Sequence, residues 1–552
     1  MRADIPKAPW KGWLTPAAAV LLVAAAAAAG WWGCAQYRES KLAALAATGL
    51  WRPQIHFYAG PRWNNDPNGP ILLNGQYHLF YQYNPFGDQW GHMSWGHAVS
   101  ADLVHWQTLP VALAEENGVM IFNGTAVADL HNTSGLCGSA GQETPGCLVA
   151  VYTGASKNGQ NQNVTFSRDG GNTWTKYGGN PVIDLGLKDF RDPKVFWHEP
   201  SKSWVMAVVI PDRHKVQIYR SANLTHWQLA SEFGPAGAVG GIWECPDLME
   251  LAVRDAQGQR VGSHWVLNVN LNPGGPAGGS ASQYFVGQFD GFRFTEDHPG
   301  SGPLWADWGK DFYASTSFAN IPKDQDRVWI AWMSNWQYAG LTPSMPGRGE
   351  MTLARRLFLR QIQVQPGAVS LALVQEPILP IPEHKLAADS LTVDQANARL
   401  TDEKAAGSVY ALNVILEPGA AGETGVRLRR STSQANGQAE EETVVGVDRA
   451  KGEIFVDRRR SGATFFAKDF PARTAAPLKH ANASAIRLQI VVDRNSVEVF
   501  AEDGETVLTN LIYPQAASRG LEFYATPGAA GGEPARFRGV DFVSLELLAA
   551  AK

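Results

Sequence analysis

Three short segments of the chain each place one carboxylate beside proline or glycine, in stretches dense with aromatic rings and amides. They are Trp-Asn-Asn-Asp-Pro-Asn-Gly at 63–69, Arg-Asp-Pro at 191–193 and Trp-Glu-Cys-Pro-Asp at 243–247, with the acids Asp66, Asp192 and Glu244. Two carboxyl groups held on turns can break a glycosidic bond, while rings and amides hold the sugar. Each segment alone is also typical of an ordinary turn. The three in this order predict a sugar-cleaving site.

Length and composition place the chain among large globular proteins rich in turns. Its 552 residues predict two or three domains, and 45% hydrophobic with 18% charged residues provide ample core. The net charge of −5 and the lack of a basic stripe argue against a nucleic-acid partner. The 20 Trp and 56 Gly suit an all-β protein, and surplus Trp suits sugar binding because a flat ring covers a sugar's apolar face.

Short strand-like runs alternate with turns from about 50 to 375, and no long amphipathic helix interrupts them. A polar turn ending in a ring recurs as Ser-Ala-Asp-Leu-Val-His-Trp at 100–106, Ser-Arg-Asp-Gly-Gly-Asn-Thr-Trp at 167–174 and Ser-Ala-Asn-Leu-Thr-His-Trp at 221–227, with a weaker echo at 289–294. Ring-to-ring spacings of 68, 53 and 67 residues fit one four-stranded sheet per repeat. We therefore expect a five-bladed β-propeller over 50–375; the alternative is a set of hairpins that share the motif by chance.

The two ends of the chain differ from this repeat region. Residues 1–35 combine a positive start, an Ala-rich apolar run and small residues at 33–35, which predicts a signal peptide and a secreted protein, extracellular or periplasmic. The alternatives are an uncleaved N-terminal anchor, because an apolar run of about 19 residues could span a bilayer, and lipidation at Cys34.

Residues 376–385 are Pro-rich and predict a linker or an extended seam. Short alternating runs over 386–552 predict a β-sandwich, with Arg458–Arg460 on a solvated face.

The cysteines allow one crosslink. Cys137 and Cys147 bracket a short polar loop, so they form either a disulfide, as an exported protein permits, or two free thiols. Cys245 follows Glu244 directly, and we expect it to pack beneath that acid rather than react. No spacing matches a metal site, and sugar hydrolysis by two carboxyl groups requires no ion, so neither a metal nor a cofactor is expected.

A propeller would gather the three acids. Its inner strands meet at one axial funnel, so residues far apart in sequence become neighbours there. Asp66 and Asp192 lie 126 residues apart, about two repeats, and Glu244 follows 52 residues later, about one repeat. The separations therefore predict that the carboxyl groups converge from three different blades.

Taken together, the motifs resemble glycoside hydrolase family 32, the β-fructofuranosidases, over about residues 50–545. Besides the three acidic segments, the matching stretches are Gln-Tyr-Asn-Pro at 82–85, Ser-Trp-Gly-His-Ala at 94–98, Phe-Asn-Gly-Thr-Ala at 122–126, Tyr-Phe-Val-Gly at 284–287, Asp-Phe-Tyr-Ala at 311–314, Trp-Met-Ser-Asn-Trp at 332–336 and Ser-Val-Glu-Val-Phe at 496–500. The last of these is similar to a stretch of the family's β-sandwich.

The resemblance implies a role for each acid. Asp66 would be the nucleophile that attacks the anomeric carbon of a terminal fructosyl unit, and Glu244 would be the acid and then the base. Asp192 would hold fructose hydroxyls and steady the transition state. The acid must keep its proton near neutral pH, which the apolar neighbours Trp243 and Cys245 would favour. Arg191 would instead keep Asp192 ionised.

The resemblance also implies a sugar pocket, whose lining residues would be Asn65, Gln82, Trp90, Phe122, Asn123, Arg191 and Trp336. Three positions depart from the family's pattern. Asn123 stands where Ser is usual, Ser94 where His is frequent, and Gly347 where Trp is common. These departures concern the shape of the pocket rim rather than the carboxylates.

We expect an exo-acting, configuration-retaining enzyme that trims fructose from β-fructans, with levan ahead of inulin and sucrose as a side substrate. A monomer without a membrane partner after signal cleavage is expected. The enzyme alternatives are an arabinan- or xylan-cleaving propeller of family 43 and a fructosyltransferase, which passes the same intermediate to a sugar. A non-catalytic sugar-binding propeller is the alternative of a different class. The Asp-rich turn at 167–174 also resembles a sialidase motif, but that turn is structural and peripheral.

Overall fold

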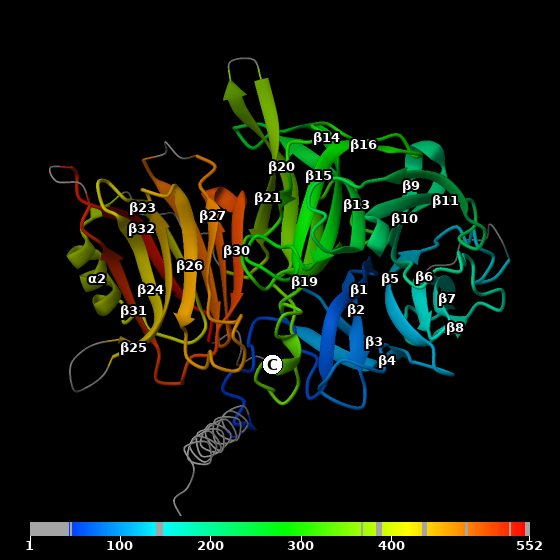
Figure 1. Ribbon diagram of the computed structural model, residues 1–552, viewed down its shortest axis with the longest axis horizontal. Helices are drawn as coiled ribbons and strands as arrows, with labels where there is room; N and C mark the ends of the chain where they lie inside the picture. Colours follow the sequence, from blue (N-terminus) through cyan, green and yellow to red (C-terminus); the bar gives the residue numbers. More distant parts are fainter. Residues whose placement is uncertain are drawn as a thin grey trace, which may run out of the picture.

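The computed structural model describes residue 44 and residues 47–139, 147–365, 368–381, 389–432, 439–480, 484–528 and 532–546. The predicted signal peptide, 1–35, lies outside these ranges. Strands dominate the described part, so the all-β prediction is confirmed. Two bodies of sheets lie side by side, one drawn in blue to green and the other in yellow to red (Figure 1). No helix among the described residues is long and apolar enough to cross a membrane.

Three antiparallel sheets of four strands open the first body, and each follows the chain order without a crossover. The first sheet holds β1 (Trp63–Leu73), β2 (Gln76–Asn84), β3 (Ser94–Ser100) and β4 (Trp106–Leu113). The second holds β5 (Met120–Ala128), β6 (Leu148–Ser156), β7 (Gly159–Ser167) and β8 (Thr175–Lys176). The third holds β9 (Arg191–His198), β10 (Ser203–Ile210), β11 (Lys215–Ser221) and β12 (Gln228–Phe233).

A larger sheet completes this body. One antiparallel run contains β13 (Ile242–Arg254), β14 (Arg260–Asn272), β15 (Ala281–Phe289) and β16 (Phe294–Glu296), with β17 (Leu304–Trp305) beside β15. A second run contains β18 (Tyr313–Ser317), β19 (Arg327–Trp332), β20 (Arg355–Gln365) and β21 (Ala368–Pro377). A short parallel pairing of β13 with β20 joins the two runs. Because β21 continues to Pro377, the first two residues of the predicted linker belong to this sheet.

The first strands of successive runs contact one another in a closed ring, in the order β1, β5, β9, β13, β18 and back to β1. This is the arrangement of a β-propeller, in which the inner strand of every sheet faces a shared axis. Residues that begin these strands therefore meet, although they are far apart in sequence.

The recurring turn motif has the same local structure each time it appears. Ser100, Ser167 and Ser221 each accept backbone N–H bonds through Oγ, and the Asp or Asn two residues later accepts two more. The closing ring then donates its indole N–H to a backbone carbonyl three residues earlier, at 2.8–3.0 Å. These self-contained turns join the third and fourth strands of three sheets, as the repeat predicts.

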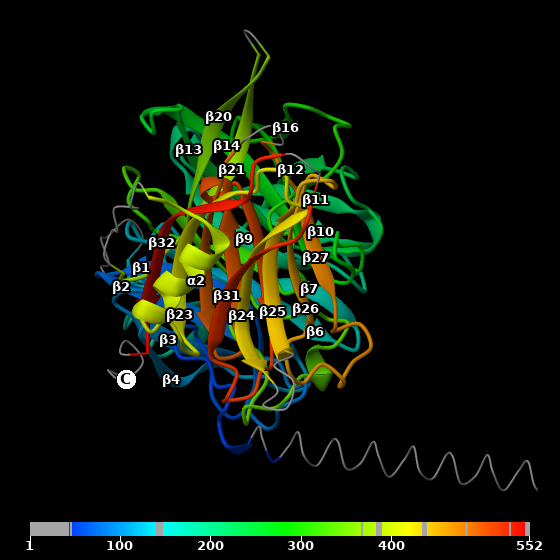
Figure 2. The ribbon, with the colours of Figure 1, turned by 90° about the vertical axis from the view of Figure 1, so that its left-hand side faces the viewer.

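The second body packs two antiparallel sheets over an apolar core, as predicted for a β-sandwich. One sheet has the order β22 (Ser390–Leu391), β32 (Arg536–Ser544), β23 (Tyr410–Glu417), β28 (Ile486–Asp493), β29 (Ser496–Ala501) and β30 (Thr506–Leu511). The other has the order β27 (Arg473–Pro477), β26 (Glu453–Arg460), β25 (Ala439–Asp448), β24 (Glu423–Thr432) and β31 (Gly520–Ala525). Helix α2 (Val393–Asp402), which the sequence analysis did not predict, lies against this sandwich (Figure 2).

Buried ion pairs join the two bodies. Arg355 on β20 bonds Glu498 on β29 at 2.6 Å and Asp307 at 3.1 Å, and all three side chains are excluded from solvent. His56 bridges Asp493 and Glu498 at 2.8 and 2.9 Å. Breaking a buried pair leaves an uncompensated charge, so this network fixes how the sandwich sits against the propeller.

Arg458 is buried, contrary to the prediction. We predicted Arg458–Arg460 to be solvated, but Arg458 is fully buried and bonds Asp311 of the propeller at 2.5 Å. Its guanidinium also donates to the hydroxyl of Tyr338 at 2.8 Å. Arg459 and Arg460 do lie on the surface. The prediction failed for Arg458 because its partners come from the other body, more than a hundred residues away.

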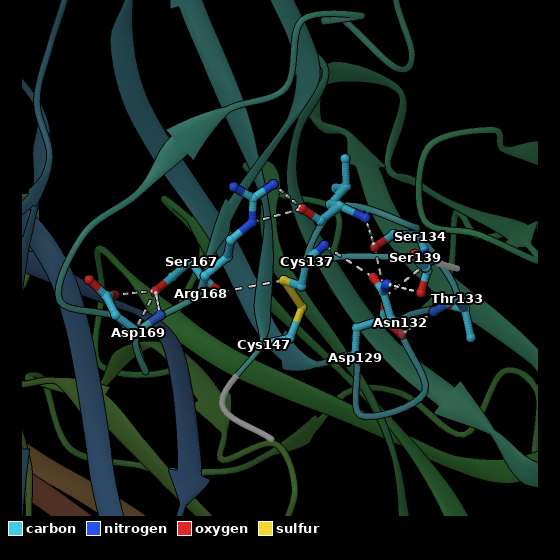
Figure 3. Close-up of a disulfide and its surroundings, with 12 residues drawn as sticks. Asp129, Asn132, Thr133, Ser134, Cys137, Ser139, Cys147, Ser167, Arg168 and Asp169 are labelled. Atoms are coloured by element: carbon cyan, nitrogen blue, oxygen red, sulfur yellow. Dashed lines mark hydrogen bonds between the residues drawn. A yellow bond between two sulfur atoms is a disulfide. The ribbon is translucent and has the colours of Figure 1, made fainter. Parts of the chain in front are cut away.

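The structure joins Cys137 and Cys147 in a disulfide beside β6 and β7 (Figure 3). Asp129 accepts hydrogen bonds from the backbone of Thr133 and Ser134, which folds the loop that carries Cys137. Arg168 donates to the carbonyl of Leu136 at 2.7 Å. The crosslink therefore ties this loop to the outer part of the second sheet.

Candidate active site

Every strand of the inner ring carries a β-bulge near its start. In each, two residues of the inner strand lie opposite one residue of its neighbour. The bulged pairs are Asn65–Asp66 on β1, Phe122–Asn123 on β5, Asp192–Pro193 on β9, Cys245–Pro246 on β13 and Ala314–Ser315 on β18. A bulge bends a strand and re-aims its side chains. The same device, repeated around the ring, turns the candidate residues toward the axis.

Backbone strain marks three of these bulges. Asp192, Cys245 and Ala314 have φ values of 67°, 45° and 52°, in the left-handed region that side chains other than glycine rarely adopt. Gly69 in the first motif has φ 46°, and a Cβ there would come within 2.8 Å of the Ala126 backbone nitrogen on β5. The Asn-Gly of the motif therefore permits β1 to approach β5 closely. Strain of this kind clusters at functional sites.

The Asp66 carboxylate is buried at the centre of the ring. Its Oδ2 accepts a hydrogen bond from Nδ2 of Asn123 at 2.9 Å, and Oδ1 has no partner among the described residues. Burial raises the pKa of Asp66 to about 6, although the Asn123 amide works in the opposite direction. The side chain is therefore ionised above about pH 6 and presents one free oxygen.

Cys245 lies between two of the acids. Its Sγ is 3.9 Å from Oδ2 of Asp66 and 3.6 Å from Oδ2 of Asp192, and Asn123 donates to it at 3.0 Å. Its backbone N–H also donates to Asp192 at 2.9 Å. Burial and the surrounding carboxylates raise the pKa of this thiol well above its usual range. Cys245 is therefore buried as predicted, but its thiol packs against Asp66 and Asp192 rather than beneath Glu244.

Arg191 lowers the pKa of its neighbour Asp192 but bonds other carboxylates more closely. Its guanidinium donates to Oε1 of Glu244 at 2.9 and 3.1 Å and to Asp189 at 2.8 Å, but its nearest approach to Asp192 is 3.9 Å. Burial raises the pKa of Asp192 more than Arg191 lowers it, and the Glu244 charge adds to the rise. Arg191 therefore acts on Asp192 in the predicted direction, but its charge does not offset the effect of burial.

Glu244 also has different surroundings from those predicted. Arg191 holds one carboxyl oxygen, and the buried hydroxyl of Tyr313 on β18 donates to the other. Trp243 lies in an apolar core and bonds the carbonyl of Ala238 instead. Successive side chains of a strand point to opposite faces, so Trp243 cannot line the pocket beside Glu244. Tyr313 was missed as a site residue, although it lies in the Asp-Phe-Tyr-Ala motif.

An unpartnered amide lies across from Asp66 on the neighbouring strand. Gln82 is the single residue opposite the Asn65–Asp66 bulge, and both polar atoms of its buried side chain lack a hydrogen-bond partner within the described residues. Asn65 accepts from the Trp63 indole at 2.8 Å. A buried amide without partners is costly unless something else bonds it, so Gln82 is suited to bind sugar hydroxyls.

Aromatic rings surround these amides. Trp336 stacks on Trp63, with ring centroids 6.0 Å apart, and also contacts Trp332. Trp90 is half-exposed, and its ring meets that of Phe122 edge-to-face at 6.2 Å. Of the predicted pocket residues, Asn123 and Arg191 bond the acids directly, and Trp90 is the most exposed.

Two of the departures from the family's pattern have local explanations. Ser94 is buried and bonds the carbonyl of His92 and the backbone N–H of Glu115. At Gly347 a Cβ would lie 2.1 Å from the carbonyl oxygen of Gly60, so this backbone has no space for the more common Trp.

A buried ion pair lies just beyond the acids along the strands. Lys194 on β9 bonds Asp247 on β13 at 3.1 Å and the carbonyl of Ser317 on β18 at 2.6 Å. The backbone N–H of Ser317 donates in turn to Asp247 at 2.5 Å. This contact links the strands that carry Asp192, Glu244 and Tyr313. Within the described ranges, no three or more His, Cys, Asp or Glu side chains gather closely enough to hold a metal ion.

Comparison with known families decides the assignment. The family model described as glycosyl hydrolases family 32 N-terminal domain matches residues 56–373, and the family 32 C-terminal model matches 382–543. The chain belongs to glycosyl hydrolase family 32. This family 32 enzyme is a glycoside hydrolase, and the family acts on fructans and sucrose.

Characterised family 32 relatives align with most of this chain. A levanase of Bacillus subtilis is 45% identical over 487 residues, covering 87% of this chain and 68% of its own. An extracellular exo-inulinase of Aspergillus awamori is 39% identical over 514 residues, covering 87% and 92%.

Solved structures agree with the family assignment. The crystal structure of exo-inulinase from Aspergillus awamori superposes with a TM-score of 0.77 and 37% identity, covering 90% of this chain and 98% of its own. A fructofuranosidase of Schwanniomyces occidentalis complexed with fructose gives a TM-score of 0.75 and 32% identity, covering 89% and 99%.

Proposed function

We propose that this family 32 enzyme is an exo-acting, configuration-retaining β-fructosidase. It releases terminal fructose from β-fructans, prefers levan to inulin, and also cleaves sucrose. The observation that carries the proposal is the gathering of Asp66, Asp192 and Glu244 around one axis by the bulged inner strands. Buried amides beside them are free to bond the hydroxyls of a fructose ring.

The first step forms a fructosyl-enzyme. Asp66, ionised and with Oδ1 free, attacks the anomeric carbon C2 of the terminal fructose. The bond from C2 to the glycosidic oxygen breaks as the ester bond to Asp66 forms. Glu244 gives its proton to that oxygen, so the remaining chain, or glucose from sucrose, leaves as an alcohol.

The second step frees the enzyme. Glu244, now a carboxylate, takes a proton from water as the water oxygen attacks C2. The ester bond to Asp66 breaks, and Asp66 leaves as a carboxylate. Two inversions at C2 give net retention. Arg191 and Tyr313 position both oxygens of Glu244 for these transfers. Asp192 would bond hydroxyls of the sugar and steady the oxocarbenium-like transition state.

The substrate assignment is supported by the relatives. An exo-inulinase aligns over nine tenths of its own length, which supports trimming from chain ends. A levanase has the higher identity of the two, 45% against 39%, which supports levan ahead of inulin. The relatives described as extracellular support secretion of this enzyme as well.

The closed ring of inner strands supports a propeller of five blades. We expect the enzyme to be a monomer.

A time course of products from levan, inulin and sucrose tests the function. End-trimming gives free fructose from the first time point, and NMR of fresh product shows the β-anomer before it equilibrates. A ladder of oligomers would contradict exo action, and the inverted anomer would contradict double displacement. Longer fructans formed at high sucrose would indicate a fructosyltransferase instead.

A further inference from the structure

Two loops meet beside the start of β1, the strand that carries Asp66. One joins β2 to β3 (residues 85–93), and the other joins β19 to β20 and contains the short helix η3 (Ala339–Leu341). Arg348 donates to the carbonyl of Asp88 at 3.1 Å and also pairs with its carboxylate. Gln89 donates to the carbonyl of Gly340 at 3.4 Å. The two loops therefore form one connected rim.

This rim exposes apolar side chains. Phe86 is 74% exposed and Leu341 is 57% exposed, more than any other large hydrophobic side chain among the described residues. Trp90, in the first of these loops, is 45% exposed. Exposed apolar groups that cluster beside a site mark a binding surface, whereas single ones scattered over a protein need no explanation.

The exposed loop is held in one shape. Asn84 accepts the backbone N–H of Phe86 at 2.9 Å and donates to the carbonyl of Gln89 at 2.8 Å. The backbone N–H of Trp63, where β1 begins, donates to the carbonyl of Gly87 at 2.9 Å. Phe86 is therefore presented by a bonded turn that is anchored to the strand carrying Asp66.

The rim is also continuous with the acids. Trp90 contacts the Phe122 ring, and the next residue, Asn123, bonds Asp66. The backbone at Gly347, directly before Arg348, leaves no room for a bulky ring at that position. The exposed apolar surface on this rim thus comes from Phe86, Leu341 and Trp90.

We propose that this rim binds the leaving side of a fructan chain, at units beyond the one next to the scissile bond. The inference rests on the proposed function. Apolar faces of the furanose rings lie on Phe86 and Leu341, and their hydroxyls bond the polar groups between them, Asp88 and Gln89. A sugar offers this alternation of apolar faces and hydroxyls. Sucrose has a single unit on the leaving side and is too short to reach the rim.

Kinetics on substrates of different length test the proposal. For Phe86→Ala and Leu341→Ala we expect kcat/KM on inulin and levan to fall about three- to tenfold, mainly through KM, because each loses one apolar contact with the chain. Activity on sucrose should stay within about twofold of wild type, on the same scale of contact energies. The matched controls are Phe292→Ala and Leu229→Ala, which truncate exposed side chains elsewhere on the surface. They should leave kcat/KM unchanged on all three substrates.

Three results would overturn the proposal: equal losses on sucrose and polymer, no loss on polymer, or losses of similar size in the control variants. A fourth contradicting result would come from light scattering. If the wild type is a dimer and Phe86→Ala is a monomer, the rim is a contact between two copies of the chain rather than a fructan-binding surface. If the wild type releases no fructose from any of these substrates, the proposed function fails rather than the rim.

Discussion

At the residue scale, Asn123 partly offsets the effect of burial on the charge of Asp66. Burial favours the protonated form of Asp66, whereas the hydrogen bond from Asn123 favours the carboxylate that can attack. The same amide contacts Cys245, so it also spaces the thiol from the acid. This residue differs from the family's usual Ser, and its amide reaches both groups at once.

Replacing Asn123 should shift the pH dependence of activity. In Asn123→Ala the pKa of Asp66 rises above about 6, since the lost hydrogen bond had lowered it. The acid limb of the kcat/KM profile, which reports ionisation of the free enzyme, should move to higher pH. The loss of activity relative to wild type should be about three- to tenfold larger below pH 6 than at pH 8.

Asn123→Ser, which restores a shorter donor and the residue usual in the family, should show a smaller movement of that limb. A limb that stays fixed or moves to lower pH in Asn123→Ala would contradict this account of Asp66.

Sequence motifs predicted which residues would meet, but not which charges would pair. Arg191 and Asp192 are neighbours in sequence, yet Arg191 bonds Glu244 on the next inner strand. Trp243 likewise turns away from Glu244 into a core. Neighbouring strand residues face opposite sides, and the bulges change that alternation locally. Pairing across strands therefore could not be derived from spacing alone.

At the element scale, the bulges need support from the strands that follow them. Lys194, Asp247 and Ser317 form a buried contact two to four residues beyond Asp192, Glu244 and Tyr313. Because it joins β9, β13 and β18, it fixes the relative positions of the three strained bulges. The strained backbone at Asp192 and Cys245 persists only while this surrounding structure holds it.

Removing the Lys194 charge should destabilise the propeller strongly. Lys194→Met leaves Asp247 buried and unpaired, so the free energy of unfolding should fall by about 3–5 kcal/mol in urea titrations. Adding Asp247→Asn should recover part of that loss, because the uncompensated charge is removed.

Lys176→Met is the matched control, since Lys176 pairs with Glu116 at the surface. It should leave stability nearly unchanged. Equal effects of Lys194→Met and Lys176→Met would show that the buried contact does not support the strands.

The order of strands was more predictable than the links between sheets. The recurring Ser, Asp or Asn, and Trp turn is a local hydrogen-bonded unit, so its spacing reported the repeat directly. Helix α2 has a local signature that was missed, because Thr392 and Gln395 form a capping box at its start. The pairing of β13 with β20 has no such signature and depends on neighbours distant in sequence.

At the scale of the whole molecule, buried charges orient the sandwich against the propeller. His56 lies between Asp493 and Glu498, and Arg355 bonds Glu498 from the propeller side. Arg458 reaches Asp311 in the opposite direction. In each of these contacts the two partners are distant in sequence and belong to different bodies. The charged run at Arg458–Arg460 therefore indicated a solvated surface when the sequence was considered alone.

Alkaline pH should weaken this interface. Burial lowers the pKa of His56, but its hydrogen bonds and charge interactions with Asp493 and Glu498 raise it overall from 6.5 to about 10. Because the folded-state pKa lies above the unfolded value, its stabilisation is fully present below pH 6.5 and is lost as pH rises through 10. The free energy of unfolding should therefore decline between pH 7 and 10.

His56→Gln should be less stable at pH 7 and should flatten that decline. His92→Gln removes a histidine at the surface and should not change the slope. A wild-type curve that is flat from pH 7 to 10 would contradict the charged state assigned to His56.

The most direct test of the mechanism is to trap the fructosyl-enzyme. Glu244→Gln cannot activate water, so an activated fructosyl fluoride, whose leaving group needs no proton, should load the enzyme faster than it empties. After acid quench and digestion, mass spectrometry should find one fructosyl unit on the peptide containing Asp66. Fructose on another residue, or fluoride release without any labelled peptide, would contradict the assignment of Asp66 as the nucleophile.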